Sequence, residues 1–294
     1  MELLLAISLI STLIYNVGRK YYSNTTTKAY YSAFSFNFIT ALVTIIVLLC
    51  WGGTFSISLT TALLGAGYGV LMVLSGGLTI VAFQKGPMSL SNVVICFSTV
   101  LTALSGKIFW GEQLFLSQII GIVLMLISFI FIPSRNSQER KASISWFILC
   151  IFLMFCSCGI GLFQKIHQAS NYKLELKGFL TTAFIVVAVV SLIISLIMSR
   201  KNAFSVILNQ NKKINVKPII TMIIVGVATG VVNRLNLYLA GVIPSAIFFP
   251  VVNGGSIILC TIAAFIIFKE KLQKLQWIGL IVGVVALAFL CFRF

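Results

Sequence analysis

Ten runs of about 20 mainly apolar residues, separated by short polar connectors, constrain this chain more than any other feature. A helix that crosses a bilayer needs about 20 such residues. Of the 294 residues, 60% are hydrophobic and 9% are charged, whereas a soluble domain is roughly 45–50% apolar and about 25% charged. We therefore expect an all-α integral membrane protein with ten transmembrane helices. The runs are 2–18, 30–51, 60–83, 88–110, 113–132, 144–165, 177–199, 217–240, 244–268 and 274–292.

The connectors predict how the chain is divided. Only the segments 133–143 and 200–216 are long, and the first of them separates five runs from the next five. The predicted division is therefore a first repeat over 1–132, a loop over 133–143 and a second repeat over 144–294. Met1 is followed by no basic leader and no small-residue cleavage site, so the first run is expected to be a retained helix.

The two halves resemble each other in the order of their features. In each half a tight proline turn precedes a long run, a glutamate, a short turn and a glycine-containing run. Because each half has five spans, the second would enter the membrane from the opposite side, which is the inverted repeat that is frequent in secondary transporters. At an offset of 158 residues the matching pairs are Ala82 with Ala240, Ser98 with Ser256, Glu112 with Glu270, Leu114 with Leu272, Gln118 with Gln276 and Gly121 with Gly279.

The formal net charge of +16 is carried by the connectors. Basic residues beside apolar spans favour anionic lipid headgroups as a partner and not nucleic acid. Fifteen of the 21 Lys and Arg residues lie in the connectors after the odd-numbered spans, which places those connectors in the cytoplasm and both termini outside. The opposite side carries Lys107, Lys165, Lys173, Lys177 and Arg293.

The segment from Gly86-Pro87 through Glu112 to Gly121 resembles the EamA-type unit of the drug/metabolite transporter superfamily. Pro244 through Glu270 to Gly279 resembles a second copy, although Lys269-Glu270 departs from the usual Gly-Glu pair. The resemblance covers essentially the whole chain. It implies ten helices, a central cavity between spans 1–4 and 6–9, and alternating access. Relatives move amino acids, other metabolites, nucleotide sugars or drugs, and are often drawn with both termini in the cytoplasm, opposite to the charge count.

Arg234 is the one charged residue placed well inside a predicted span. Arginine in hydrocarbon costs at least about 2.5 kcal/mol, so it should face water or a partner. Its guanidinium fork suits a carboxylate, which makes Arg234 a candidate substrate-binding residue. The alternatives are that Arg234 snorkels to the interface or caps carbonyls of a neighbouring helix. Gly226, Gly230, Arg234 and Tyr238 fall on one helical stripe, and its glycines would allow close packing.

Uncharged polar residues within the spans complete the candidate cavity. Any one of them could instead hydrogen-bond between helices, for about 0.6 kcal/mol. Asn253-Gly254-Gly255 is the segment where a helix irregularity is expected to expose backbone. The substrate-binding candidates besides Arg234 are Asn16, Asn37, Ser75, Asn92, Ser98, Asn233, Tyr238, Asn253 and Ser256, and further polar positions are Tyr68, Gln84, Thr99 and Asn236.

The chain has five glutamates and no aspartate, and no glutamate falls at mid-span. Such a chain does not suit a proton-coupled exporter of lipophilic cations, which needs a buried carboxylate. Glu112 and Glu270 are either gating acids or structural groups that satisfy turn amides, together with the turn residues Gly86, Pro87 and Pro244. His167, the only histidine, is expected to be solvated at a span end.

These features favour a secondary transporter over two other classes of protein. One histidine and peripheral carboxylates do not provide the nucleophile, base or metal cluster of a membrane-embedded transferase, and the seven cysteines match no metal or redox spacing. A multidrug or lipid-linked carrier of the same fold stays open. We expect a transporter of a small polar metabolite, an amino acid or another carboxylate-bearing solute, with export favoured. It would sit in the plasma membrane, by resemblance the bacterial inner membrane, without a cofactor, as a monomer or dimer.

Overall fold

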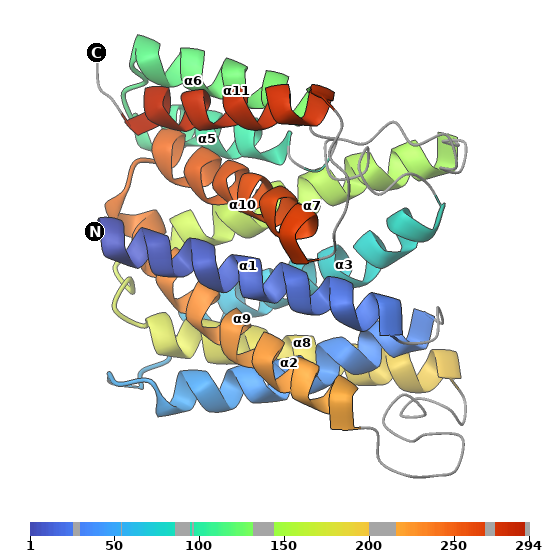
Figure 1. The fold of residues 1–294 in the computed structure, drawn as a ribbon. Helices are drawn as coiled ribbons and strands as arrows, with labels where there is room; N and C mark the ends of the chain where they lie inside the picture. Colours follow the sequence, from blue (N-terminus) through green and yellow to red (C-terminus); the bar gives the residue numbers. More distant parts are fainter. Residues whose placement is uncertain are drawn as a thin grey trace. The chain divides into compact units, whose positions relative to one another are not determined.

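The computed structural model describes residues 1–25, 30–53, 55–85, 95, 97–131, 144–199, 216–267 and 274–291. Within these ranges the chain forms ten α-helices and no strand (Figure 1). In the first half they are α1 (Glu2–Thr25), α2 (Tyr30–Cys50), α3 (Leu59–Lys85), α5 (Ser98–Trp110) and α6 (Leu116–Phe131). The second half contains α7 (Ile144–Ala169), α8 (Leu176–Ser199), α9 (Val216–Val242), α10 (Ser245–Ile267) and α11 (Lys274–Cys291). Each helix falls on one of the ten apolar runs.

Six of these helices, α1–α3 and α7–α9, are long and apolar enough to cross a membrane. Shorter apolar stretches lie in α6, α10 and α11. Large apolar side chains are exposed along the long helices, as at Leu3 and Ile197, which are 73% and 72% exposed. A water-soluble protein rarely exposes large contiguous apolar patches. These helices therefore indicate a membrane protein.

The chain forms two compact units, and each takes helices from both halves of the sequence. Unit 1 is Met1–Ile80 with Phe163–Tyr238, and unit 2 is Val81–Leu162 with Leu239–Phe294. Unit 1 thus contains α1, α2, α8 and most of α3 and α9, with the end of α7. Unit 2 contains α5, α6, α10, α11 and most of α7. Each unit therefore contains residues from both sides of the predicted repeat boundary at 133–143. The repeats were inferred from similarity between the two halves of the sequence, and they stay a prediction.

Glycines set the closest helix contacts of unit 1. α2 packs along α8 (Figure 1), and α3 approaches the first turns of α8 at Gly65 and Gly69. A Cβ on Gly65 would come within 2.6 Å of the Phe179 carbonyl oxygen, so a larger residue would push α3 off α8. Gly226 and Gly230 bring α9 against α2, because a Cβ at either position would overlap Val43 or Val47. The packing role expected for these two glycines is confirmed.

In unit 2, α6 and α11 lie side by side (Figure 1), and Ser128 Oγ donates to the Gly279 carbonyl at 2.7 Å. α10 packs on α5, α6 and α11. The expected irregularity at Asn253-Gly254-Gly255 is wrong, because α10 is continuous through these residues. Gly254 instead gives space to Met125 of α6. α10 does contain Pro250 within the helix, and this residue has no backbone N–H to donate to the preceding turn.

Candidate functional site

A buried hydrogen-bond network joins three helices in the interior of unit 1. Tyr68 Oη on α3 donates to Asn233 Oδ1 on α9 at 2.6 Å, and Gln164 Nε2 on α7 donates to Tyr68 Oη at 3.1 Å. Asn233 Nδ2 donates back to the Thr229 carbonyl at 2.9 Å. All four residues are buried. The network satisfies both ends of the Asn233 amide, so Asn233 is held in one orientation.

A second polar contact on α9 lies one helical turn beyond this network. Ser8 Oγ on α1 donates to Asn236 Oδ1. Ser8 is fully buried, which places this bond in the packed seam between α1 and α9. Thr229, Asn233 and Asn236 share one face of α9 by their spacing. This face is therefore the polar face of α9 within unit 1.

Arg234 lies on a different face of α9, one helical turn after Gly230. Its side chain is close to Gly53, just after the end of α2. Its side chain is half-buried, and Nη1 is buried without a hydrogen-bond partner. Nη2 lies 3.9 Å from the position that a Cβ on Gly53 would take. Lys177 is at the same end of α2, where its Nζ donates to the carbonyls of Leu49 at 2.8 Å and Trp51 at 3.1 Å. Two cations at the carbonyl end of α2 complement its dipole, yet Arg234 keeps an unused donor.

The polar face of α1 near its C-terminal end was not recognised from sequence. Arg19 was assigned to a connector, but α1 continues to Thr25, and Arg19 is a half-buried residue inside the helix. Its Nη1 donates to Tyr15 Oη and its Nη2 to the Gly76 carbonyl, the latter at 3.3 Å. Asn37 Nδ2 is 3.1 Å from where a Cβ on Gly76 would be. The spacing of Tyr15 and Arg19, one turn apart, was the signal available.

The predicted candidates are divided between the two units. Asn16, Ser75 and Tyr238 belong to unit 1 with Asn37, Asn233 and Arg234. Of these, Asn16 and Ser75 are half-buried, whereas Tyr238 is 44% exposed. Unit 2 holds Ser98, Glu112, Pro244, Asn253 and Ser256. Asn92, Gly86, Pro87 and Glu270 lie outside the described residues.

One of the unit 2 candidates, Asn253, connects α10 to α5. Asn253 Nδ2 donates to Thr99 Oγ1 at 3.2 Å, and Ser256 Oγ donates to the Asn253 carbonyl at 2.8 Å. Ser98 is buried at the start of α5. The Asn253–Thr99 bond is the helix-to-helix arrangement weighed above as the alternative to a cavity-facing side chain, whereas the Ser256 bond stays within α10.

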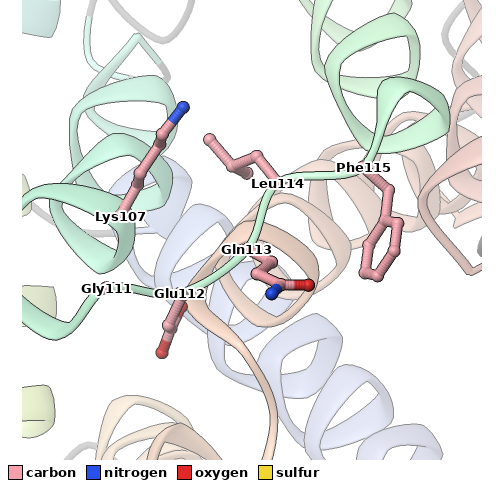
Figure 2. A pocket seen from close by; sticks show the side chains of 6 residues that line it. All are labelled: Lys107, Gly111, Glu112, Gln113, Leu114 and Phe115. Carbon is pink, nitrogen blue, oxygen red and sulfur yellow. The ribbon is translucent and has the colours of Figure 1, made fainter.

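Glu112 joins the turn after α5 to the start of α10. Its Oε2 accepts a hydrogen bond from the Ser245 amide at 2.7 Å. A carboxylate at a helix N-terminus stabilises the free amides and the positive end of the dipole. Glu112 also lines an open cavity of about 450 Å³ with Lys107, Gly111, Gln113, Leu114 and Phe115. Figure 2 shows the Glu112 carboxylate and the Lys107 ammonium pointing in different directions from this turn.

Glu175 makes a similar connection in unit 1. Its Oε2 accepts hydrogen bonds from Ser58 N at 2.8 Å and Ser58 Oγ at 2.9 Å, while Ser58 Oγ also accepts from the Thr61 amide and so caps α3. Hydrogen bonds from Thr61 and from the Ser58 amide hold the pKa of the Glu175 carboxyl below its usual range. Sequence reasoning missed this pair because it joins residues 117 apart.

His167 is not solvated, and that expectation is wrong. Its side chain is fully buried and packs against Phe179, with the ring centroids 4.5 Å apart and the rings tilted by 37°. Nε2 has no hydrogen-bond partner. α7 extends four residues beyond the predicted span end and carries His167 into the core of unit 1. Among the residues that the structure describes, no three metal-binding side chains form a group.

No family model matches the chain, and no curated protein matches it. A solved structure described only as the crystal structure of a protein is similar to it, with a TM-score of 0.73 over 98% of this chain and 94% of that one. The two sequences are 11% identical. The similarity therefore extends to the fold.

Proposed function

We propose that this protein is a secondary transporter that moves a small polar metabolite with a carboxylate group, an amino acid or a related solute, across the plasma membrane. It would work by alternating access, with export favoured. In this proposal all ten helices span the membrane as two inverted five-helix repeats of the EamA type. The proposal is supported by the six helices that are long and apolar enough to cross a membrane.

The observation that carries the proposal is the unused hydrogen-bond donor of Arg234. Nη1 is buried and lacks a partner in a helix apolar enough to cross a membrane. A guanidinium in that setting is costly unless it faces water or a counter-ion. A carboxylate that binds two of its N–H groups would satisfy both the charge and the free donor.

The polar interior of unit 1 supports the same proposal. Tyr68, Gln164 and Asn233 are bonded to one another across three helices, which fixes the stretch of α9 just before Arg234. Such support favours ligand binding, because a loosely held side chain must become ordered when the ligand binds, and this ordering costs free energy. Unit 1 thus presents a cation on a stretch of helix fixed by buried hydrogen bonds.

The test is thermal stabilisation of the purified protein by a panel of amino acids, organic acids, nucleotide sugars and lipophilic cations. A ligand at 100 times its dissociation constant should add about 2.7 kcal/mol. We expect a carboxylate-bearing solute to stabilise the wild type and to have little effect on Arg234→Gln. Arg234→Lys, which keeps the charge but loses the fork, should fall between them.

Lys177→Gln is the matched control, because it removes the other cation at the end of α2 without touching Arg234. It should keep the full response to the solute. If the two variants lose the response equally, the effect belongs to the α2 terminus and not to a binding site. Stabilisation by lipophilic cations alone, equal in wild type and Arg234→Gln, would show that the proposed substrate class is wrong.

A further inference from the structure

Unit 1 contains a second arginine, Arg19, within a helix that is long and apolar enough to cross a membrane. The window of α1 that is long and apolar enough to span runs from Glu2 to Tyr22, and Arg19 lies inside it. Two of the five guanidinium N–H groups are used by Tyr15 Oη and the Gly76 carbonyl. Among the described residues the remaining donors have no hydrogen-bond partner, which leaves them for an acceptor from outside the protein.

The charge of Arg19 has no acidic counterpart among the described residues of unit 1. The carboxylates there are Glu2 and Glu175. Glu2 lies 17 residues away on the same helix, about 25 Å along its axis. Glu175 is bonded to Ser58 and so lies at the N-terminal end of α3, whereas Arg19 contacts Gly76 near the other end of that helix. An unpaired charge in this setting favours an anionic ligand.

Donor groups around Arg19 are arranged for a carboxylate. The Tyr15 ring lies under the guanidinium, with 5.1 Å between the Cζ atom and the ring centroid, which fixes the plane of the fork. The Gly76 carbonyl accepts a hydrogen bond from Nη2 at the other edge of the guanidinium. The Asn37 side-chain amide lies against Gly76. A planar, oriented guanidinium beside a side-chain amide matches the two oxygens of a carboxylate.

Arg19 and Arg234 lie at different levels along the helices of unit 1. α1 and α9 run antiparallel, since Ser8 bonds to Asn236 and Gly18 packs on Val225. Arg19 is therefore level with residues near Val225, about nine residues below Arg234. At 1.5 Å per residue the two levels are about 14 Å apart. The Arg19 level and Arg234 thus lie on opposite sides of the middle of α9.

We propose that Arg19, with Tyr15 and Asn37, forms a second carboxylate-binding site, at the opposite end of unit 1 from Arg234. The site rests on the proposed function and deepens it: an anionic solute would bind one arginine at each end of its path. Among the described residues of unit 1, both carboxylates, Glu2 and Glu175, lie away from Arg19, so the class proposed for this site is an organic acid, which needs no acidic partner for an ammonium group.

The test uses phenylglyoxal, which modifies accessible guanidinium groups, on the full-length protein in detergent, with mass spectrometry to follow each arginine separately. The probes are pyruvate, succinate, citrate, L-alanine and L-glutamate, with dioleoylphosphatidylglycerol as a separate arm. At about ten times its dissociation constant, an organic acid that binds at Arg19 should slow the modification of Arg19 about tenfold. Arg140 and free N-acetylarginine should react at unchanged rates.

The outcomes separate this inference from the proposed function. Protection of both arginines by one organic acid supports both. Protection of Arg234 alone keeps the proposed function and overturns the second site. Protection of Arg19 alone supports carboxylate binding at Arg19 and overturns the role that the proposed function gives to Arg234. If only phosphatidylglycerol protects Arg19, the residue binds a lipid headgroup and the second site is rejected. If no solute protects either arginine, both proposals fail.

Variants of Arg19 provide a second measurement, the apparent affinity from each side of the membrane. A purely structural role of Arg19 would not change this affinity from one side only. Arg19→Lys should weaken the apparent affinity for the protecting acid in liposome uptake from one side of the membrane, and Lys20→Gln, which removes the neighbouring charge, should leave it unchanged. Equal effects from both membrane sides would contradict a site at one end of the path. If Arg19→Lys does not fold, the modification experiment on the wild type still decides the matter.

Discussion

Tyr68 and Asn233, which are 165 residues apart in the sequence, meet through a 2.6 Å hydrogen bond from the Tyr68 hydroxyl to the Asn233 side-chain oxygen. The bond joins α3 to α9, and Gln164 of α7 donates to the same hydroxyl. This relationship links the two halves of the chain inside unit 1 and holds Asn233 beside Arg234.

Tyr68→Phe should destabilise the protein by about 1 kcal/mol, because it removes the partner of the Asn233 Oδ1 atom and of the Gln164 Nε2 atom in a buried site. The measurement is the midpoint of thermal unfolding in detergent. Tyr238→Phe is the control, since Tyr238 is exposed, and its midpoint should stay at the wild-type value. Equal midpoints for Tyr68→Phe and wild type would show that the network adds no stability.

Gly65→Ala should cost about 1–3 kcal/mol, the range for overpacking a well-packed contact. The new Cβ would come within 2.6 Å of the Phe179 carbonyl oxygen, which is backbone and cannot move aside cheaply. Gly52→Ala is matched to it, because no atom lies within 4 Å of a Cβ at Gly52. A loss of stability in Gly52→Ala as large as that in Gly65→Ala would rule out the steric explanation.

Glu112→Ala should destabilise the start of α10 by about 1 kcal/mol, the usual cost of losing an N-terminal cap. Hydrogen exchange at the amides of Ser245 and the next residues should become faster, while the amides of α2 in unit 1 keep their rates. Glu112→Gln retains an acceptor oxygen and should lose less than Glu112→Ala. Unchanged exchange at Ser245 in both variants would mean that the carboxylate does not hold this helix end.

Glu175 should make stability depend on pH in the acid range only. Its pKa is lowered in the folded protein by the hydrogen bonds from Thr61 and Ser58, so the folded state binds this proton less readily than the unfolded chain. The contribution is fully present above the ordinary glutamate pKa of about 4.3 and is lost as pH falls through the lower folded-state value.

The measurement for Glu175 is the difference in unfolding midpoint between wild type and Glu175→Gln from pH 7 downward. The difference should be constant at neutral pH and shrink below about pH 4.3. Glu2→Gln, at an exposed position, serves as the control for a general loss of negative charge. A difference that grows toward acid pH would have the wrong sign and contradict the prediction.

Helix positions could be predicted because hydropathy and turn residues are local properties. Pro244 and the apolar run after it define α10 almost to the residue. Helix ends without such a breaker were less predictable, as α1 shows by running past Arg19 to Thr25. Nothing in Lys20–Asn24 terminates a helix, so the polar residues there were mistaken for a connector.

Pairing across the chain could not be predicted from one sequence. The Glu112–Ser245 and Glu175–Ser58 bonds each join residues more than 100 apart, and no local pattern specifies them. The same applies to His167, since its polarity suggested water whereas the packing of α7 on Phe179 places it in the core. Arg234 was recognisable because a charge within an apolar run has a cost that is independent of its partners.

Unit 1 combines helices from the beginning of the chain with helices made much later, and this has a consequence for biosynthesis. Ser35, Thr44 and Tyr68 emerge from the ribosome early, yet their hydrogen-bond partners, Ser195, the Gly226 carbonyl and Asn233, lie 160, 182 and 165 residues later. At about 5–20 residues per second, these early helices remain for roughly 10–35 s in the bilayer before the groups that complete them are made. Throughout that interval the nascent chain needs lipid headgroups, water or the insertion machinery to satisfy the hydroxyl groups of Thr44 on α2 and Tyr68 on α3.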